Sequence, residues 1–206
     1  MEISVNSATC YKNNVAIFNN INLSLKNGDV ALISGANGSG KTTLIKSISG
    51  IQNLESGAIL LNNIDISHRD SDFVGNIIYI GHKDSLNSDM TVHENLVYLM
   101  ALDSSSKIKD NSRIEKAMNY FDIQKYKDYF VSDLSEGNKK KISLARLIIS
   151  DKKIWILDEP LSNLDNFSIE IFIKLIVENQ KNNGISILSS HYDISKKISN
   201  VKHLEM

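Results

Sequence analysis

The sequence has one cysteine and one proline among its 206 residues. The single cysteine, Cys10, cannot form a disulfide within the chain, which excludes a disulfide-stapled extracellular scaffold and indicates a reducing compartment. No apolar run approaches the ~20 residues that a membrane-spanning helix needs, so we expect no transmembrane segment. Residues 1–7 lack the basic and apolar regions of a signal peptide, and we expect none.

The sequence also lacks a charge excess of either sign. Lys and Arg number 23, Asp and Glu number 24, and the formal net charge is −1, so bulk electrostatics give no case for nucleic acid as a partner. Hydrophobic residues make up 42% and charged residues 23%, which is ordinary for a globular protein. The length suits a single domain, residues 1–206, with room for a subdomain.

What the sequence does contain is a glycine-rich loop of the form G-x-x-x-x-G-K-T. An apolar run, Val30–Ile33, leads into it, and a helix-like stretch leads out. This strand–loop–helix arrangement points backbone N–H groups and the positive helix end at one place, which suits a phosphate. Lys41 can reach the β- and γ-phosphates, and the Thr42 hydroxyl can hold Mg²⁺. The predicted nucleotide-binding residues of the loop are Gly35, Ala36, Asn37, Gly38, Ser39, Gly40, Lys41, Thr42 and Thr43.

The rest of the chain alternates strand and helix patterns. Residues 1–27 indicate short strands around a turn at Asn13–Asn14, and residues 58–61 and 64–66 indicate two more. Apolar runs at 76–80, 154–157 and 185–188 indicate buried strands of a largely parallel sheet. We expect the strand 76–80 to run beside the phosphate-loop strand.

Between about residues 84 and 150 the pattern becomes helical, which predicts a helical subdomain inserted into the α/β core. Val92, Leu96 and Leu99 fall at helical spacing, and Thr91 with Glu94 forms a capping box. A second helical pattern precedes residue 122, residues 104–106 indicate the loop between the two, and a further helix is expected after Asn138.

An acidic pair, Asp158–Glu159, ends the buried run 154–157. Ligands of α/β sheets bind at the carboxyl ends of the strands, so both carboxylates are expected at the phosphate crevice. Asp158 can hold Mg²⁺ through water, and Glu159 can act as general base on the attacking water.

A second candidate anion site is the segment Leu134–Asn138, which offers the Ser135 hydroxyl, the Gly137 N–H and a helix N-terminus. One nucleotide does not need two phosphate cradles. From physics alone, a helix cap made by Ser135 with Asn138 is the better interpretation.

Five motifs together resemble those of ATP-binding cassette (ABC) ATPases across essentially the whole chain. The loop GANGSGKTT resembles Walker A, LSEGN resembles the signature, and IWILDE resembles Walker B. Ser162–Asp165 is similar to the D-loop, and His191 is similar to the switch histidine. The resemblance implies an α/β P-loop cassette with a mostly parallel sheet core, an antiparallel β subdomain and a helical subdomain.

The resemblance also implies how the second anion site is used. In that family two cassettes pair head to tail, and the signature of each, here Ser135 and Gly137, closes on the ATP of the other. ATP and Mg²⁺ are therefore the expected cofactors. His191 would contact the γ-phosphate, and Tyr11 is the candidate for stacking on adenine, although a structural tyrosine is an equal alternative.

The chain departs from the family pattern at two positions. His82 stands where the family has the coupling glutamine, and Asn138 ends the signature in place of glutamine. The segments YIGHK, TVHENL and WILDEP resemble the ATP-binding subunit of the cytochrome c maturation haem exporter (CcmA type).

That narrower resemblance implies a peripheral protein on the cytoplasmic face of the bacterial inner membrane. Its partners would be membrane-embedded permease subunits and a second copy of itself, and it would power delivery of haem to a periplasmic chaperone, with no nucleic acid involved. The alternatives are the ATPase of another small-substrate ABC exporter and, more remotely, a soluble ABC ATPase or a catalytically silent scaffold.

Overall fold

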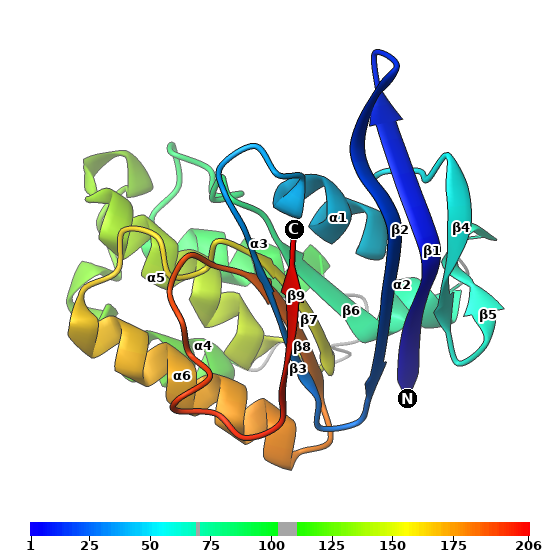
Figure 1. Cartoon of the computed structure of the whole chain (residues 1–206). Coiled ribbons are helices and arrows are strands. Elements are labelled where there is room, and N and C mark those ends of the chain that lie inside the picture. Colours follow the sequence, from blue (N-terminus) through cyan, green and yellow to red (C-terminus); the bar gives the residue numbers. More distant parts are fainter. Residues whose placement is uncertain (69–70, 103–110) are drawn as a thin grey trace.

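The computed structural model describes residues 1–68, 71–102 and 111–206 (Figure 1). Its strands are β1 (Glu2–Lys12), β2 (Val15–Lys26), β3 (Val30–Ser34), β4 (Ser56–Leu61), β5 (Ile64–Asp65), β6 (Ile77–Ile80), β7 (Ile154–Asp158), β8 (Ile185–Ser189) and β9 (Val201–Glu205). Its α-helices are α1 (Lys41–Ile48), α2 (Ser71–Asn76), α3 (Val92–Leu102), α4 (Asn111–Tyr120), α5 (Glu136–Ile149) and α6 (Asn166–Lys181). Short 3₁₀ turns lie at Ile66–His68, Gln124–Tyr126 and Val131–Asp133. No helix in these ranges is long and apolar enough to cross a bilayer.

A parallel sheet forms the centre of the molecule, with the strand order β6-β7-β8-β3-β9. The predicted parallel sheet is therefore confirmed. The predicted neighbour of β6 is wrong, because β6 pairs with β7, and β3 lies between β8 and β9. Every residue of β7 and β8 is buried, and these two strands take the protected central places.

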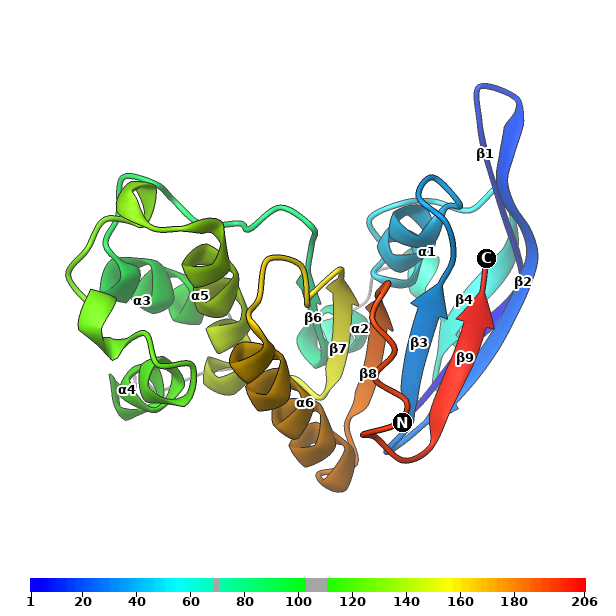
Figure 2. The ribbon, with the colours of Figure 1, turned by 60° about the vertical axis from the view of Figure 1, so that its left-hand side comes forward.

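Both faces of the parallel sheet are covered, which explains why its strands are continuous apolar runs. Along β3, Val30 and Leu32 pack toward α5 and α6, whereas Ala31 and Ile33 pack toward α1 and the antiparallel sheet. Figure 2 shows this arrangement: α3, α4 and α5 gather on one side of the strands, and β1, β2 and β4 gather on the other.

The antiparallel sheet has the order β2-β1-β4-β5. β1 and β2 form one long hairpin, with a register that runs from Glu2 opposite Lys26 to Lys12 opposite Val15. The predicted turn at Asn13–Asn14 is confirmed: φ is 52° and 62°, the two positive values that a tight hairpin turn requires.

Two elements were not predicted from the sequence patterns. The helix α2 has the sequence SDFVGN, whose Gly75 and Asn76 are poor helix formers, so no helix was expected before β6. The strand β9 is a half-exposed edge strand without a continuous apolar run. It follows β8 in the chain, so β8, the strand before His191, is not the last strand of the parallel sheet. The predicted strand 64–66 ends at Asp65, and the loop predicted at 104–106 lies outside the described residues.

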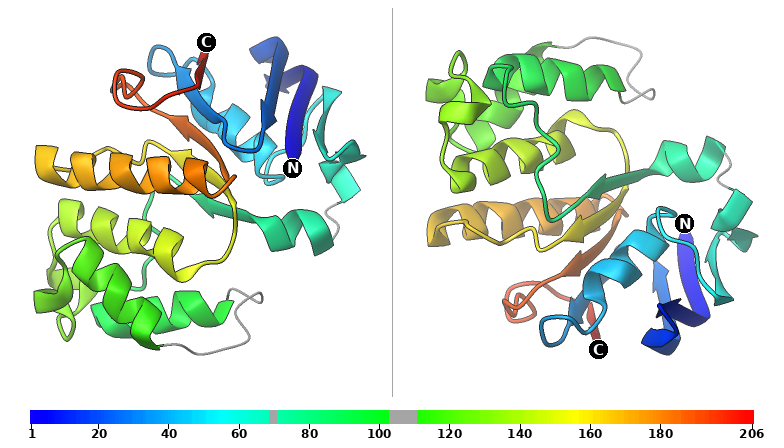
Figure 3. Two further views of the ribbon diagram at one scale, coloured as in Figure 1. Left: turned by 90° about the horizontal axis from the view of Figure 1, so that it is seen from below. Right: turned by 90° about the horizontal axis from the view of Figure 1, so that it is seen from above.

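The helices α3, α4 and α5 follow β6 and precede β7 in the chain. Figure 3 shows them from below and above, separated from the β1–β2 hairpin by α6 and the central strands. The capping box predicted at the start of α3 is confirmed, because the Thr91 N–H donates to a Glu94 carboxylate oxygen (2.8 Å) and the Glu94 N–H donates to the Thr91 hydroxyl (3.2 Å).

A buried amide fixes the loop that leads into α3. Asn95 is 1% exposed, and its side-chain oxygen accepts from the Asn87 N–H at 2.8 Å. Its side-chain nitrogen donates to the carbonyls of Asn87 (2.9 Å), Met90 (3.2 Å) and Thr91 (3.0 Å). The Asn95 side chain thus ties the loop residues 87–91 to the first turn of α3.

We predict that Asn95→Ala lowers the free energy of unfolding by about 3 kcal/mol, because the change removes a buried amide together with its four hydrogen bonds to the loop backbone. Urea unfolding followed by circular dichroism measures the change. Asn119→Ala, on the exposed side of α4, is the matched control and should stay within about 0.5 kcal/mol of the parent. Equal stability of the two variants would contradict the role given to Asn95.

Candidate active site

The phosphate loop leaves β3 at Ser34 and enters α1 at Lys41. The Lys41 side chain, only 7% exposed, folds over the loop, and its ammonium donates to the carbonyls of Gly35 (2.9 Å) and Ala36 (3.0 Å). The loop backbone therefore fixes a positive charge at the N-terminus of α1, where the helix dipole adds to it. An anion at this place would be met by both.

Glycine is required where the loop turns into the helix. Gly40 has φ of 101°, and a Cβ there would lie 2.8 Å from Cγ2 of Ile17 and 3.0 Å from its carbonyl oxygen. The β2 strand thus packs directly on the loop, and a larger residue would push the two apart. This contact places Ile17 at the rim of the site.

The Asp158 carboxylate lies behind the loop at the end of β7 and is 1% exposed. Its Oδ1 accepts from the hydroxyls of Ser189 (2.8 Å) and Thr42 (3.1 Å), while its buried Oδ2 has no hydrogen-bond partner among the described residues. An orphaned carboxylate oxygen beside a hydroxyl is a donor set that suits Mg²⁺, which prefers hard oxygen ligands. Burial, and then the charge of Asp158, raise the pKa of the Tyr79 hydroxyl nearby.

Glu159 follows in a strained backbone conformation, with φ of 48°. Its N–H donates to the Ser189 hydroxyl (2.9 Å), and its carbonyl accepts from the Ser162 hydroxyl (2.9 Å), so this turn is fixed on both sides. Strain held by such contacts is typical of functional positions. The turn aims the carboxylate toward His191, whose Nε2 lies 3.5 Å from Oε1.

One cleft of about 490 Å³ collects these groups. Its lining residues, which come from segments far apart in the chain, are Lys12, Ile17, Asn37, Gly38, Gly40, Lys41, Thr42, Thr43, His82, Glu159, Ser162 and His191. The volume falls in the range of small-molecule sites. Thus, the structure brings together the predicted residues Lys41, Thr42, His82, Glu159 and His191, and Asp158 lines the adjoining hollow with Thr42 and His82.

Tyr11 does not line this cleft. Its side chain is 45% exposed in β1, and the residues that reach the cleft from the same hairpin are Lys12 and Ile17. The bulges in the pairing of β1 with β2 near Cys10 and Tyr11 set which side chain turns inward, and periodicity alone does not reveal them.

Ser135 and Gly137 lie at the start of α5 and also do not line the cleft. Ser135 is the N-cap of α5, and its hydroxyl accepts from the Asn138 N–H at 3.4 Å, the geometry of the helix-cap alternative. A Cβ on Gly137 would lie 2.7 Å from the carbonyl oxygen of Asn163, so the helix start packs closely on the turn 162–165. Neither residue is therefore placed to contact a ligand in the cleft of its own chain.

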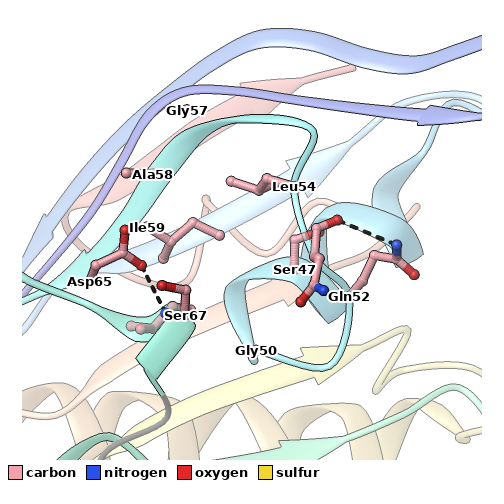
Figure 4. A pocket seen from close by; sticks show the side chains of 11 residues that line it. Ser47, Gly50, Gln52, Leu54, Gly57, Ala58, Ile59, Asp65 and Ser67 are labelled. Atoms are coloured by element: carbon pink, nitrogen blue, oxygen red, sulfur yellow. Dashed lines mark hydrogen bonds between the residues drawn. The ribbon is translucent and has the colours of Figure 1, made fainter.

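A second hollow of about 400 Å³ lies between the end of α1, β4 and Ile66–Ser67 (Figure 4). Of the described residues that line it, Asp65 carries the charge, and its carboxylate accepts from the Ser67 N–H at 2.8 Å, which closes a local turn. It contains none of the predicted site residues.

Residues 18–162 match the family model described as ABC transporter, which covers more than half of the chain. The chain belongs to the ABC transporter family. This membership accounts for the phosphate-loop motif, because ATP hydrolysis is coupled to transport in this family.

Two curated relatives and one solved structure show what this cassette is similar to. The protein of Reclinomonas americana named "Cytochrome c biogenesis ATP-binding export protein CcmA" is 34% identical over 95% of this chain and 87% of its own length. A protein of the same name from Photobacterium profundum is 27% identical over 99% of each chain. A dimeric ATP-binding cassette in a post-hydrolysis state, bound to ADP and Pi, superposes with a TM-score of 0.86 over 99% of this chain and 96% of its own, at 19% identity.

Sequence reasoning missed three residues of the cassette's site. Lys12 and Ile17 reach the cleft from the hairpin, and Ser189 joins Asp158 to the backbone of Glu159. Ser189 ends β8, a buried strand next to β7. Its place at a strand end, rather than its residue type, is the feature that could have identified it from the sequence.

We predict that Asp158→Asn raises the Mg²⁺ concentration for half-maximal ATP hydrolysis by about 10- to 100-fold, because an amide is a weaker ligand than the carboxylate. A magnesium titration of the phosphate-release rate measures this. Asp128→Asn makes the same chemical change at an exposed position and should leave the titration unchanged. An unaltered magnesium requirement in Asp158→Asn would contradict the ligand assignment.

Proposed function

We propose that this ABC ATPase drives the haem export complex of cytochrome c maturation. The observation that carries the catalytic part is the convergence of Lys41, Thr42, Glu159 and His191 on one cleft. The export part is supported by the relative that is 34% identical over 95% of this chain and is named a cytochrome c biogenesis export protein. His82, in the place of the coupling glutamine, supports the same assignment.

The geometry supports definite roles within the cleft. Lys41 neutralises charge on the β- and γ-phosphates, and the loop N–H groups bind their oxygens. Glu159, held by its strained turn, orients the attacking water and accepts its proton, and the imidazole of His191 contacts the γ-phosphate. Thr42 and Asp158 would hold Mg²⁺, which would supply positive charge beside the phosphates.

The position of the signature supports a paired assembly. Ser135 and Gly137 lie outside their own chain's cleft, and the structurally similar cassette bound to ADP and Pi is a dimer. We infer that two copies pair head to tail, so that each α5 N-terminus faces the γ-phosphate in the other copy. A mixed pair with a homologous cassette is the alternative assembly.

The transport assignment implies a location and partners. The ATPase would lie at the cytoplasmic face of the inner membrane, bound to permease subunits through the helical subdomain at about residues 84–150. His82 lines the cleft and begins the segment that leads to α3, so it would couple hydrolysis to the permease. Tyr11 is exposed beside the cleft. It would stack on adenine only if the base of a bound nucleotide extended past Lys12.

We predict that Glu159→Gln lowers ATP turnover at least about 100-fold, because the amide keeps the shape and loses the base. The same variant should fail to restore holocytochrome c in a strain that lacks this protein. Glu115→Gln, on the exposed side of α4, is the matched control and should restore both.

The two readouts separate the two parts of the proposal. Normal turnover by Glu159→Gln would overturn its role as base. Normal holocytochrome c in the deletion strain, with turnover intact in the purified protein, would end the haem assignment and favour another small-substrate exporter.

A further inference from the structure

Three consecutive lysines at the start of α5 pair with acidic residues in three different places. Lys139 pairs with Glu136 of its own helix (2.9 Å), and Lys141 pairs with Asp165, the N-cap of α6 (3.3 Å). Lys140 pairs with Asp84 in the loop after β6 (3.1 Å). Of these three pairs, that of Lys140 reaches the loop that carries His82.

Lys140 differs from its neighbours in burial. The Lys140 side chain is 2% exposed and that of Asp84 is 13% exposed, whereas Lys139 and Glu136 are 23% and 67% exposed. A buried ammonium is stable only where oxygen atoms compensate for lost water, so its partners cannot move away without cost. Exposed pairs carry no such constraint.

The contact with Asp84 is an ion pair, and the Lys140 ammonium donates its hydrogen bond to the backbone carbonyl of His82, at 3.3 Å. His82 therefore connects two parts of the molecule: its carbonyl is held by α5, and the residue lines the cleft with Lys41 and Glu159. Arg146, further along α5, donates to the carbonyl of Tyr79 in β6 (3.5 Å). Figure 2 shows the segment after β6 running past α5.

We infer that Lys140 is a positioning residue for His82 and locks the loop 82–84 to the helix that carries Ser135 and Gly137. The loop that faces the chain's own nucleotide and the helix start that faces the partner's nucleotide then move as one body. This inference rests on the proposed ATPase function, because it gives the mechanical link between the two half-sites of one chain.

The test uses the full chain with Lys140→Met, which keeps the length and apolar stem of the side chain and removes the charge. We expect kcat for ATP to fall about tenfold while KM stays within about twofold, since the phosphate loop is untouched and His82 is misplaced. Amide hydrogen exchange of residues 81–86 should become faster by about tenfold, and exchange of residues 35–43 should not change.

Two further variants keep the test decisive. Asp84→Asn removes the charged partner and leaves the bond from Lys140 to the His82 carbonyl, so it should change kcat and exchange in the same direction by a smaller amount. Combining it with Lys140→Met should add little, because Lys140→Met already removes the ion pair. Lys139→Met is the matched control and should leave kcat and the exchange of residues 81–86 unchanged.

The outcomes distinguish this inference from the proposed function. Absence of ATP turnover in the parent protein would overturn the proposed function, while faster exchange confined to residues 81–86 would still support the lock. Normal kcat in Lys140→Met and Asp84→Asn, or exchange that rises uniformly along the chain, would overturn the positioning role of Lys140.

Discussion

The parallel pairing of β6, β7, β8 and β3 is the constraint on which the site depends. Parallel strands end at the same edge of a sheet, so the residues that follow each strand meet there although they are far apart in the chain. His82 follows β6, Glu159 follows β7, His191 follows β8, and the phosphate loop follows β3. Burial of both sheet faces holds this edge in place, because a shift of any strand would expose apolar side chains.

Hydrogen bonds at this edge fix the positions of the side chains that follow the strands. The Ser189 hydroxyl donates to Asp158 and accepts from the Glu159 N–H, and Thr42 at the start of α1 donates to the same carboxylate. Three neighbouring segments are thereby joined through one buried side chain. A separate set of contacts, from Lys140 to Asp84 and to the His82 carbonyl, ties α5 to the loop that borders the same cleft.

The sequence predicts most of this arrangement, because the candidate site residues directly follow buried apolar runs or lie in a loop whose glycines adopt positive φ. Local patterns do not specify which strands are neighbours, so β6 was expected beside β3 and lies beside β7. The half-exposed β9 and the short helix α2 carry weak local signals for the same reason. Whether Tyr11 or Lys12 turns toward the cleft depends on bulges in the hairpin, which no spacing encodes.

The central claim, that the signature completes the site of a second copy, is tested most directly by cysteine cross-linking between two chains. Both chains carry Glu159→Gln to retain ATP and lack the buried Cys10; one has Ser135→Cys and the other Asn37→Cys in the phosphate loop. A short bifunctional thiol reagent should join them when ATP is present and not when it is withheld. A failure to join them in ATP, or equal joining without nucleotide, would contradict the account.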